Sequence, residues 1–171
     1  MRTHSILIAG LLLGSAAGYG ANSKSDASGS AAAAFSRLKT LVGEWEADSQ
    51  MGKVHVSYEL VAGGTALLER ESSDKMPVML TIYHVDGDRL LLTHYCMAGN
   101  QPRMQAKPFD SATGELEFRF LDVTNLANPG AGHMHNAKIR FADERHFSAE
   151  WEFYENGQRK FAENAQYTRV R

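Results

Sequence analysis

The chain has 171 residues, of which 43% are hydrophobic, with a formal net charge of −2 and a single cysteine. One cysteine excludes an internal disulfide, so a folded domain of this chain depends on packing for its stability. The charges are mixed and include no basic run, which excludes the pattern typical of proteins that bind nucleic acid or an anionic membrane surface.

The N-terminal residues have the pattern of a secretory signal peptide. Arg2 gives a short basic start, residues 6–13 form an apolar run, and small residues occupy positions 15–18. The apolar run is too short to span a bilayer, which takes about 20 helical residues. We therefore predict that residues 1–18 are a signal peptide, that the protein is periplasmic or secreted, and that it has no stable membrane insertion after cleavage.

Residues 19–30 are mostly Gly, Ala, Ser, Asn and Lys and are predicted to form a disordered linker. Residues 31–171 then form a single domain, long enough to bury a core. The domain opens with a predicted helix over residues 31–41, in which Phe35 and Leu38 lie on one apolar stripe.

After this helix the hydrophobic period changes to two, which is the period of half-buried strands. Turn signals such as Asp86-Gly87 and Asn156-Gly157 separate the alternating segments, and no segment has the pattern of a crossover helix. The sequence predicts an all-β fold, an up-and-down antiparallel β-barrel of about ten strands with the N-terminal helix capping one end.

Because strand side chains alternate between two faces, the apolar positions predict which polar side chains lie inside the barrel. Counting back in twos from Phe141 places His135 and His133 on the inner face. On an earlier strand, alternation with leucines places His94 and Cys96 inside. The interior is therefore predicted to hold a small group of histidines.

An apolar wall with a few convergent polar groups is the composition of a ligand cavity. The favoured hypothesis is a binding protein for a small, apolar or amphipathic ligand with one polar or acidic group. The predicted polar contacts come from His94, Asn100, Arg103, His133 and His135, and the predicted wall from Phe118, Phe120, Phe147 and Trp151. For Arg103, clamping a ligand carboxylate and pairing with a surface acid remain alternatives.

Other chemistries could use the same histidines. His133 and His135, with His94 as a third ligand, are candidates for a zinc site. One histidine could instead hold a haem, which would be non-covalent because the chain has no C-x-x-C-H motif. An enzyme that works by histidine acid–base chemistry is a further alternative. Cys96 is a poor nucleophile candidate, because residues two apart on a strand are about 7 Å apart at the backbone and His94 is badly placed as its base.

The motif Leu41-Val42-Gly43-Glu44-Trp45, following an amphipathic helix, resembles the opening of calycin-type barrels such as lipocalins, fatty-acid-binding proteins and nitrobindins. Segments 58–69, 86–90 and 94–104 are similar to uncharacterised bacterial lipocalin-like domains. The resemblance implies a barrel over residues 35–171 with Trp45 packed at its closed end. It also implies haem as a possible ligand, although the later glycines of the nitrobindin motif are replaced by Ala47 and Ser49.

Overall fold

The computed structural model describes residues 25–49 and 52–170, and the predicted signal peptide lies outside these ranges. The described part begins with helix α1 (Ser25–Lys39), so residues 25–30 of the expected linker are helical. Ala31, Phe35 and Leu38 are buried on one side of α1, as the apolar stripe predicts.

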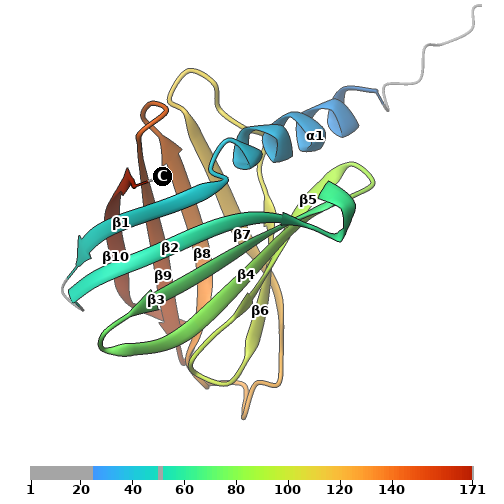
Figure 1. Ribbon diagram of the computed structural model, residues 1–171. Coiled ribbons are helices and arrows are strands. Elements are labelled where there is room, and N and C mark those ends of the chain that lie inside the picture. The colour runs from blue at the N-terminus through green and yellow to red at the C-terminus, as the bar shows by residue number, and fades with distance from the viewer. Residues whose placement is uncertain (1–24, 50–51, 171) are drawn as a thin grey trace, which may run out of the picture.

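Ten strands follow and close into a barrel in which each strand pairs antiparallel with its neighbours in sequence, and β1 pairs with β10 (Figure 1). This confirms the predicted fold class. The strands are β1 (Gly43–Ser49), β2 (Gly52–Val61), β3 (Ala66–Ser73), β4 (Met76–Asp86), β5 (Arg89–Tyr95), β6 (Gln101–Ala106), β7 (Glu115–Thr124), β8 (His133–Phe141), β9 (His146–Glu155) and β10 (Gln158–Arg169).

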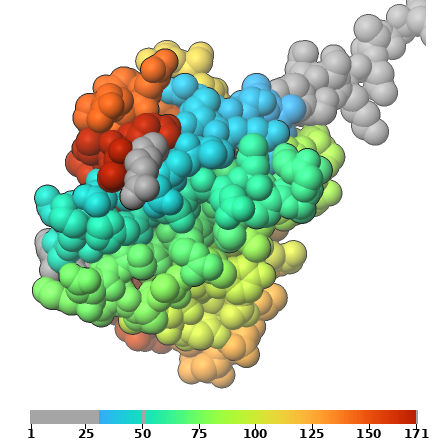
Figure 2. All heavy atoms as spheres, in the orientation of Figure 1, coloured from blue at the N-terminus to red at the C-terminus, as the bar shows by residue number. Residues whose placement is uncertain are grey.

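Helix α1 lies across one end of the barrel, beside the turn between β4 and β5 (Figures 1 and 2). We call this the helix end. It also holds the start of β1 and the end of β10. The opposite end, where β5 turns into β6 and β9 into β10, carries no helix in the described part of the chain, and we call it the open end.

Trp45 on β1 and Arg169 on β10 join the first and last strands to the segment between α1 and β1. Trp45 is buried, and its indole Nε1 donates a hydrogen bond to the carbonyl of Leu41 at 2.7 Å. The Arg169 guanidinium lies 4.1 Å above the Trp45 ring and donates to the carbonyls of Thr40 and Val42. The last strand is thereby held against the segment that joins α1 to β1.

Alternate positions of the strands supply the core, as period-two patterning requires. On β9, Phe147 and Ala149 are buried while His146 is exposed. Phe147 packs edge-on against Trp45, with ring centroids 4.7 Å apart, and this contact lies in the half of the barrel nearer the helix. Within residues 25–49 and 52–170, no helix combines the length and the apolar character that crossing a membrane requires.

Candidate functional site

A mostly apolar cavity of about 530 Å³ opens at the end of the barrel opposite the helix. Strands that the sequence separates by a hundred residues meet here, because barrel closure brings the first and last strands together. Six methionine or phenylalanine side chains make most of the apolar wall, and the lining also includes Cys96 and Glu163. The principal lining residues are Met76, Met79, Met134, Phe153, Phe161 and Glu163.

A second, smaller cavity of about 20 Å³ lies directly beneath this one. The two cavities share Met79, Met134 and Glu163 in their walls. The small cavity is also lined by His94 and Trp151, whose ring centroids lie 4.9 Å apart. It therefore forms a polar floor to an apolar chamber.

His94 is held in the floor by a chain of buried polar side chains. Thr81 Oγ1 lies 3.0 Å from Nδ1 of His94 and donates to a carboxylate oxygen of Glu69 at 3.4 Å. The hydroxyl of Tyr83 donates to the other oxygen of Glu69 at 2.6 Å. The chain exists because Glu69, Thr81 and His94 are direct cross-strand partners on β3, β4 and β5.

The second nitrogen of the His94 ring, Nε2, has no hydrogen-bond partner within the protein. Over residues 25–49 and 52–170, only His94 Nε2 and Asn100 Oδ1 are buried side-chain polar atoms without a hydrogen-bond partner. A buried unpaired polar atom costs about 1–3 kcal/mol, so such atoms call for an explanation in terms of function or bound groups.

Burial lowers the pKa of His94 to about 4, because the apolar surroundings disfavour the imidazolium. The ring is therefore neutral at neutral pH. A general base works best with a pKa near the working pH, so this imidazole is poorly matched to proton abstraction. It is well suited to a hydrogen bond with a bound molecule.

Two further carboxyl groups line the small cavity. Glu71 follows Glu69 by two positions on the inner face of β3, and Glu163 lies opposite Trp151 on β10. Burial raises the pKa of Glu71 to about 8, and the nearby Glu69 and Glu163 act in the same direction. Burial also raises the pKa of Glu163.

His133 and His135 do not join this floor, contrary to the expectation from alternation. The pairing of β8 with β9 shifts between Met134 and Asn136, which marks a bulge at His135. Met134 pairs with Phe153 and both line the open-end cavity, whereas His133 pairs with Tyr154, one position along on each strand. Since neighbouring strand residues face opposite sides, His133 faces away from the cavity.

The two histidines instead form an aromatic cluster between β7 and β9. His133 Nε2 and His135 Nδ1 lie 3.1 Å apart. The His135 ring stacks on Phe120 and on Tyr154, with centroid distances of 4.3 and 4.2 Å. Phe120, expected in the ligand wall, thus packs against histidines.

Arg103 and Asn100 also have partners within the protein. Arg103 is exposed and forms a two-point ion pair with Asp122, in which Nε donates to Oδ1 at 2.6 Å. This is the surface pairing that the sequence left open as the alternative to a carboxylate clamp. Asn100 is buried and donates to the carbonyl of Gly132 at 2.8 Å, which ties the β5–β6 connection to the start of β8.

Of the four aromatic residues expected in the wall, only Trp151 lines either of the two stacked cavities, and it lines the smaller one. Phe118 is buried beside Tyr83, with centroids 5.7 Å apart, and Phe147 belongs to the Trp45 core. Cys96 lines the larger cavity, and burial raises the pKa of its thiol, so it stays protonated and has the character of a packing residue.

The described residues do not provide the zinc site considered from sequence, since no three His, Cys, Asp or Glu side chains among them are placed to hold a metal ion. Haem does not fit at His94 either, for want of space. The cavity that His94 lines has about 20 Å³, which holds about one water molecule, so a planar macrocycle does not fit in it.

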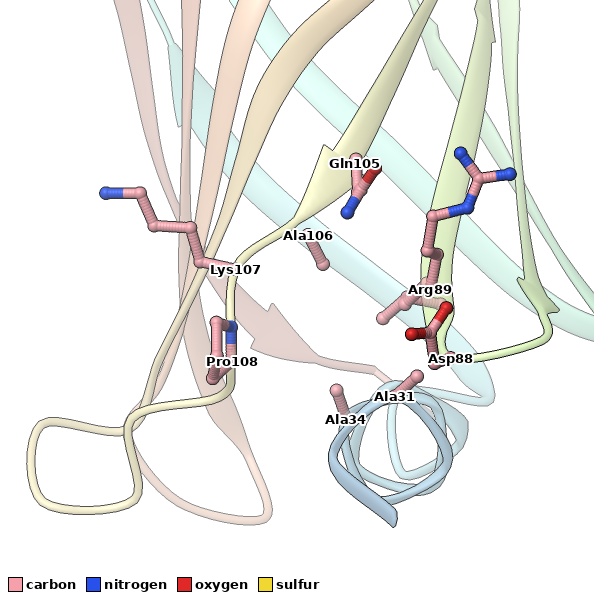
Figure 3. A pocket seen from close by; sticks show the side chains of 9 residues that line it. Ala31, Ala34, Asp88, Arg89, Gln105, Ala106, Lys107 and Pro108 are labelled. Atoms are coloured by element: carbon pink, nitrogen blue, oxygen red, sulfur yellow. The ribbon is translucent and has the colours of Figure 1, made fainter. Parts of the chain in front are cut away.

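Two other hollows lie at the helix end. One, of about 320 Å³, is bordered by Ala31 and Ala34 of α1 and by strand ends of β5 and β6. Figure 3 shows both alanines facing the strand ends while Lys107 extends away from the helix. The other, of about 700 Å³, is bordered by the 111–114 turn and Arg37. Neither is lined by His94 or Asn100, the two described residues with a buried side-chain atom that lacks a partner, whereas His94 lines the small cavity beneath the open-end cavity. The open-end cavity together with this floor is therefore the better candidate site.

Sequence reasoning did not identify Glu69, Glu71 and Glu163 as interior residues. A signal was present in β3, where Glu69 and Glu71 share the alternation of the buried Leu67. Glu163 shares its face with Ala165 and Tyr167, which are buried on β10.

Neither a protein-family model nor a curated protein matches the sequence. Among solved structures, a protein of unknown function from the DUF3598 family of Nostoc punctiforme PCC 73102 matches with a TM-score of 0.53 and 12% identity, covering 78% of this chain and 49% of its own. Rv2717c from M. tuberculosis matches with a TM-score of 0.53 and 18% identity, covering 81% of this chain and 98% of its own. The chain thus spans about half of the first structure and nearly all of the second. These likenesses show the barrel fold alone.

Proposed function

We propose that the barrel binds a small, mostly apolar ligand with one polar group, held in the open-end cavity with that group at the His94 floor. The observation that carries this proposal is the unpaired, buried Nε2 of His94 beneath an apolar chamber of about 530 Å³. Pockets of this size, apolar with a few fixed polar groups, are typical of small-molecule sites.

Of the residues that the sequence nominated, His94 and Trp151 are proposed as ligand contacts. The wall is supplied by Met79, Met134 and Phe153, which line the larger cavity. Methionine side chains adapt to irregular apolar shapes, so this wall suits a ligand with a flexible hydrocarbon part.

Binding is tested by fluorescence titration with N-phenyl-1-naphthylamine, a neutral apolar probe whose emission rises when it leaves water. Saturable binding at one site is expected. Met79→Trp fills the cavity and is expected to reduce the affinity at least tenfold. Val78→Trp is the matched control, because Val78 is the neighbouring residue on β4 and is exposed on the outside.

Met134→Trp blocks the cavity from the opposite wall and provides a second variant if Met79→Trp unfolds, as judged by circular dichroism. A probe that binds the wild-type protein and both blocked variants equally would contradict the proposal. So would a folded wild-type protein that does not bind the probe.

We also propose that the protein is exported and works in the periplasm or outside the cell. The support is the signal-peptide pattern of residues 1–18. Mass spectrometry of the protein from the periplasmic or culture fraction should show a chain that lacks these residues. A full-length chain confined to the cytoplasm would overturn this part of the proposal.

The motif around Gly43 and Trp45 supports a further proposal, that the barrel is of the calycin type. Trp45 lies near the start of the first strand and packs at the helix end, which is the position that the resemblance implies.

A further inference from the structure

We propose that the polar group of the ligand is an amine, held as an ammonium ion by Glu71, Glu163 and His94 at the floor of the open-end cavity. This inference rests on the proposed binding function and names the chemical class of the ligand. The sequence was compatible with a ligand that carries an acidic group, whereas an ammonium ion has the opposite charge.

The free nitrogen of His94 is a hydrogen-bond acceptor. Thr81 uses its hydroxyl hydrogen to donate to Glu69, so its oxygen is left to accept a hydrogen bond from Nδ1–H of His94. A neutral imidazole carries one hydrogen, so Nε2 then has a lone pair and no hydrogen. Its partner on the ligand must be a donor.

The other polar groups of the floor favour the same partner. Glu71 and Glu163 line the small cavity beside His94, and each becomes an acceptor only once it is ionised, a form that a bound cation favours. Trp151 lies in the same wall, and an indole face attracts a cation through its quadrupole. An ammonium ion offers up to three N–H donors and a positive charge, which matches all four groups.

A carboxylate ligand is disfavoured by the same residues. Neither of the two stacked cavities has a lysine or an arginine among its lining residues. The arginine that the sequence suggested as a clamp, Arg103, is exposed and paired with Asp122. A carboxylate at the floor would have no cation to balance its charge, and ionisation of Glu71 or Glu163 beside it would add repulsion.

Binding of an ammonium ion is expected to release a proton from Glu71, whose pKa burial raises to about 8. The titratable groups that face Glu71 are Glu69 on its own strand, Tyr83 and Tyr167, Cys96, His94 and Glu163. None of these is a cation at neutral pH, so only the ligand can stabilise the ionised form. The affinity for an amine should therefore rise between pH 6 and pH 8, where an alkylamine with a pKa near that of lysine, about 10.4, remains charged.

Three probes with the same chain, decylamine, decanol and decanoate, separate this inference from the proposed function. Isothermal titration at pH 7 should give decylamine at least tenfold tighter binding than decanol, with decanoate the weakest. Repeating the titration in buffers of different ionisation enthalpy should show release of roughly one proton for the amine and none for the alcohol.

Glu71→Gln keeps the shape of the side chain and removes its charge. It should weaken decylamine at least tenfold and leave decanol within twofold, and Glu163→Gln provides a second variant of the same kind. Glu59→Gln is the control, because Glu59 is exposed on the outside of β2. Decanol or decanoate binding as tightly as decylamine would overturn the amine inference and leave the binding function intact. No binding by any of the three probes would overturn both.

Discussion

The residues that hold His94 at the floor of the cavity are brought together by strand register and not by closeness in sequence. Glu69, Thr81 and His94 lie on three adjacent strands and meet because they are direct cross-strand partners. Their hydrogen bonds satisfy Nδ1 of the imidazole and leave Nε2 to the cavity. The position of the free nitrogen is therefore set by the barrel, and no local motif encodes it.

The half-buried Glu71 predicts a dependence of stability on pH. Its pKa in the folded state is about 8, above the ordinary value of 4.5, so folding favours the protonated form. Its contribution is fully present below pH 4.5 and is lost as the pH rises to 8. Within that window the free energy of unfolding should fall by about 1.4 kcal/mol per pH unit relative to a variant without the carboxyl.

His94 titrates in the opposite sense, since its lowered pKa of about 4 makes stability rise with pH up to its ordinary value of 6.5. The range from pH 6.5 to 8 isolates Glu71 from His94. Urea unfolding of the wild type and Glu71→Gln at both pH values measures the effect. If the free energies of unfolding of the two proteins changed with pH in parallel, the folded state would not raise the pKa of Glu71.

Alternation was sufficient to predict His94 inside the barrel, because its strand has no irregularity before Tyr95. The same rule applied to Glu69 and Glu71 would have placed them inside. Arg103 shows the limit of the approach: its partner Asp122 lies on the next strand across a register shift, and the sequence gives no direct sign of that pairing.

At the level of strands, a bulge in β8 decides which side chains reach the ligand cavity. One extra residue at His135 reverses the alternation, so Met134 replaces the histidines in the cavity wall. Bulges leave little trace in a hydrophobic pattern, because both phases of this strand carry apolar and polar residues. This explains why the histidine pair was expected at the site.

His135→Ala separates the structural role of this residue from a binding role. Removing a ring that stacks on Phe120 and Tyr154 should lower the free energy of unfolding by about 1–2 kcal/mol. The affinity for N-phenyl-1-naphthylamine should stay within twofold of the wild type. A large loss of affinity in a folded variant would place His135 in the cavity and contradict the bulge.

For the whole molecule, closure of the barrel depends on contacts between the two ends of the chain. β1 and β10 pair through two register positions, and Arg169 reinforces this seam through carbonyls of residues 40, 42 and 144. Period-two patterning predicted about ten strands and their antiparallel order. It could not predict the register of the seam or the role of Arg169 in it, because pairing of the first and last strands is the longest-range contact of the fold.

Arg169→Ala should therefore destabilise the barrel more than an ordinary surface substitution does. Loss of three charge-assisted hydrogen bonds and the Trp45 contact is expected to lower the free energy of unfolding by about 2–3 kcal/mol. Arg119→Ala removes an exposed ion pair with Glu117 and should cost about 1 kcal/mol or less. Equal effects in chemical denaturation would argue that the seam does not depend on Arg169.

Methyl NMR of protein labelled with ¹³C at its methionines tests the ligand cavity most directly. Met76, Met79, Met97 and Met134 line the cavity, while Met104 is fully buried elsewhere in the core and serves as an internal control. Titration with decylamine is predicted to shift the methyl signals of Met79 and Met134 most and to leave that of Met104 in place. Saturable shifts centred on Met104, or no shifts at any cavity methionine, would contradict the account.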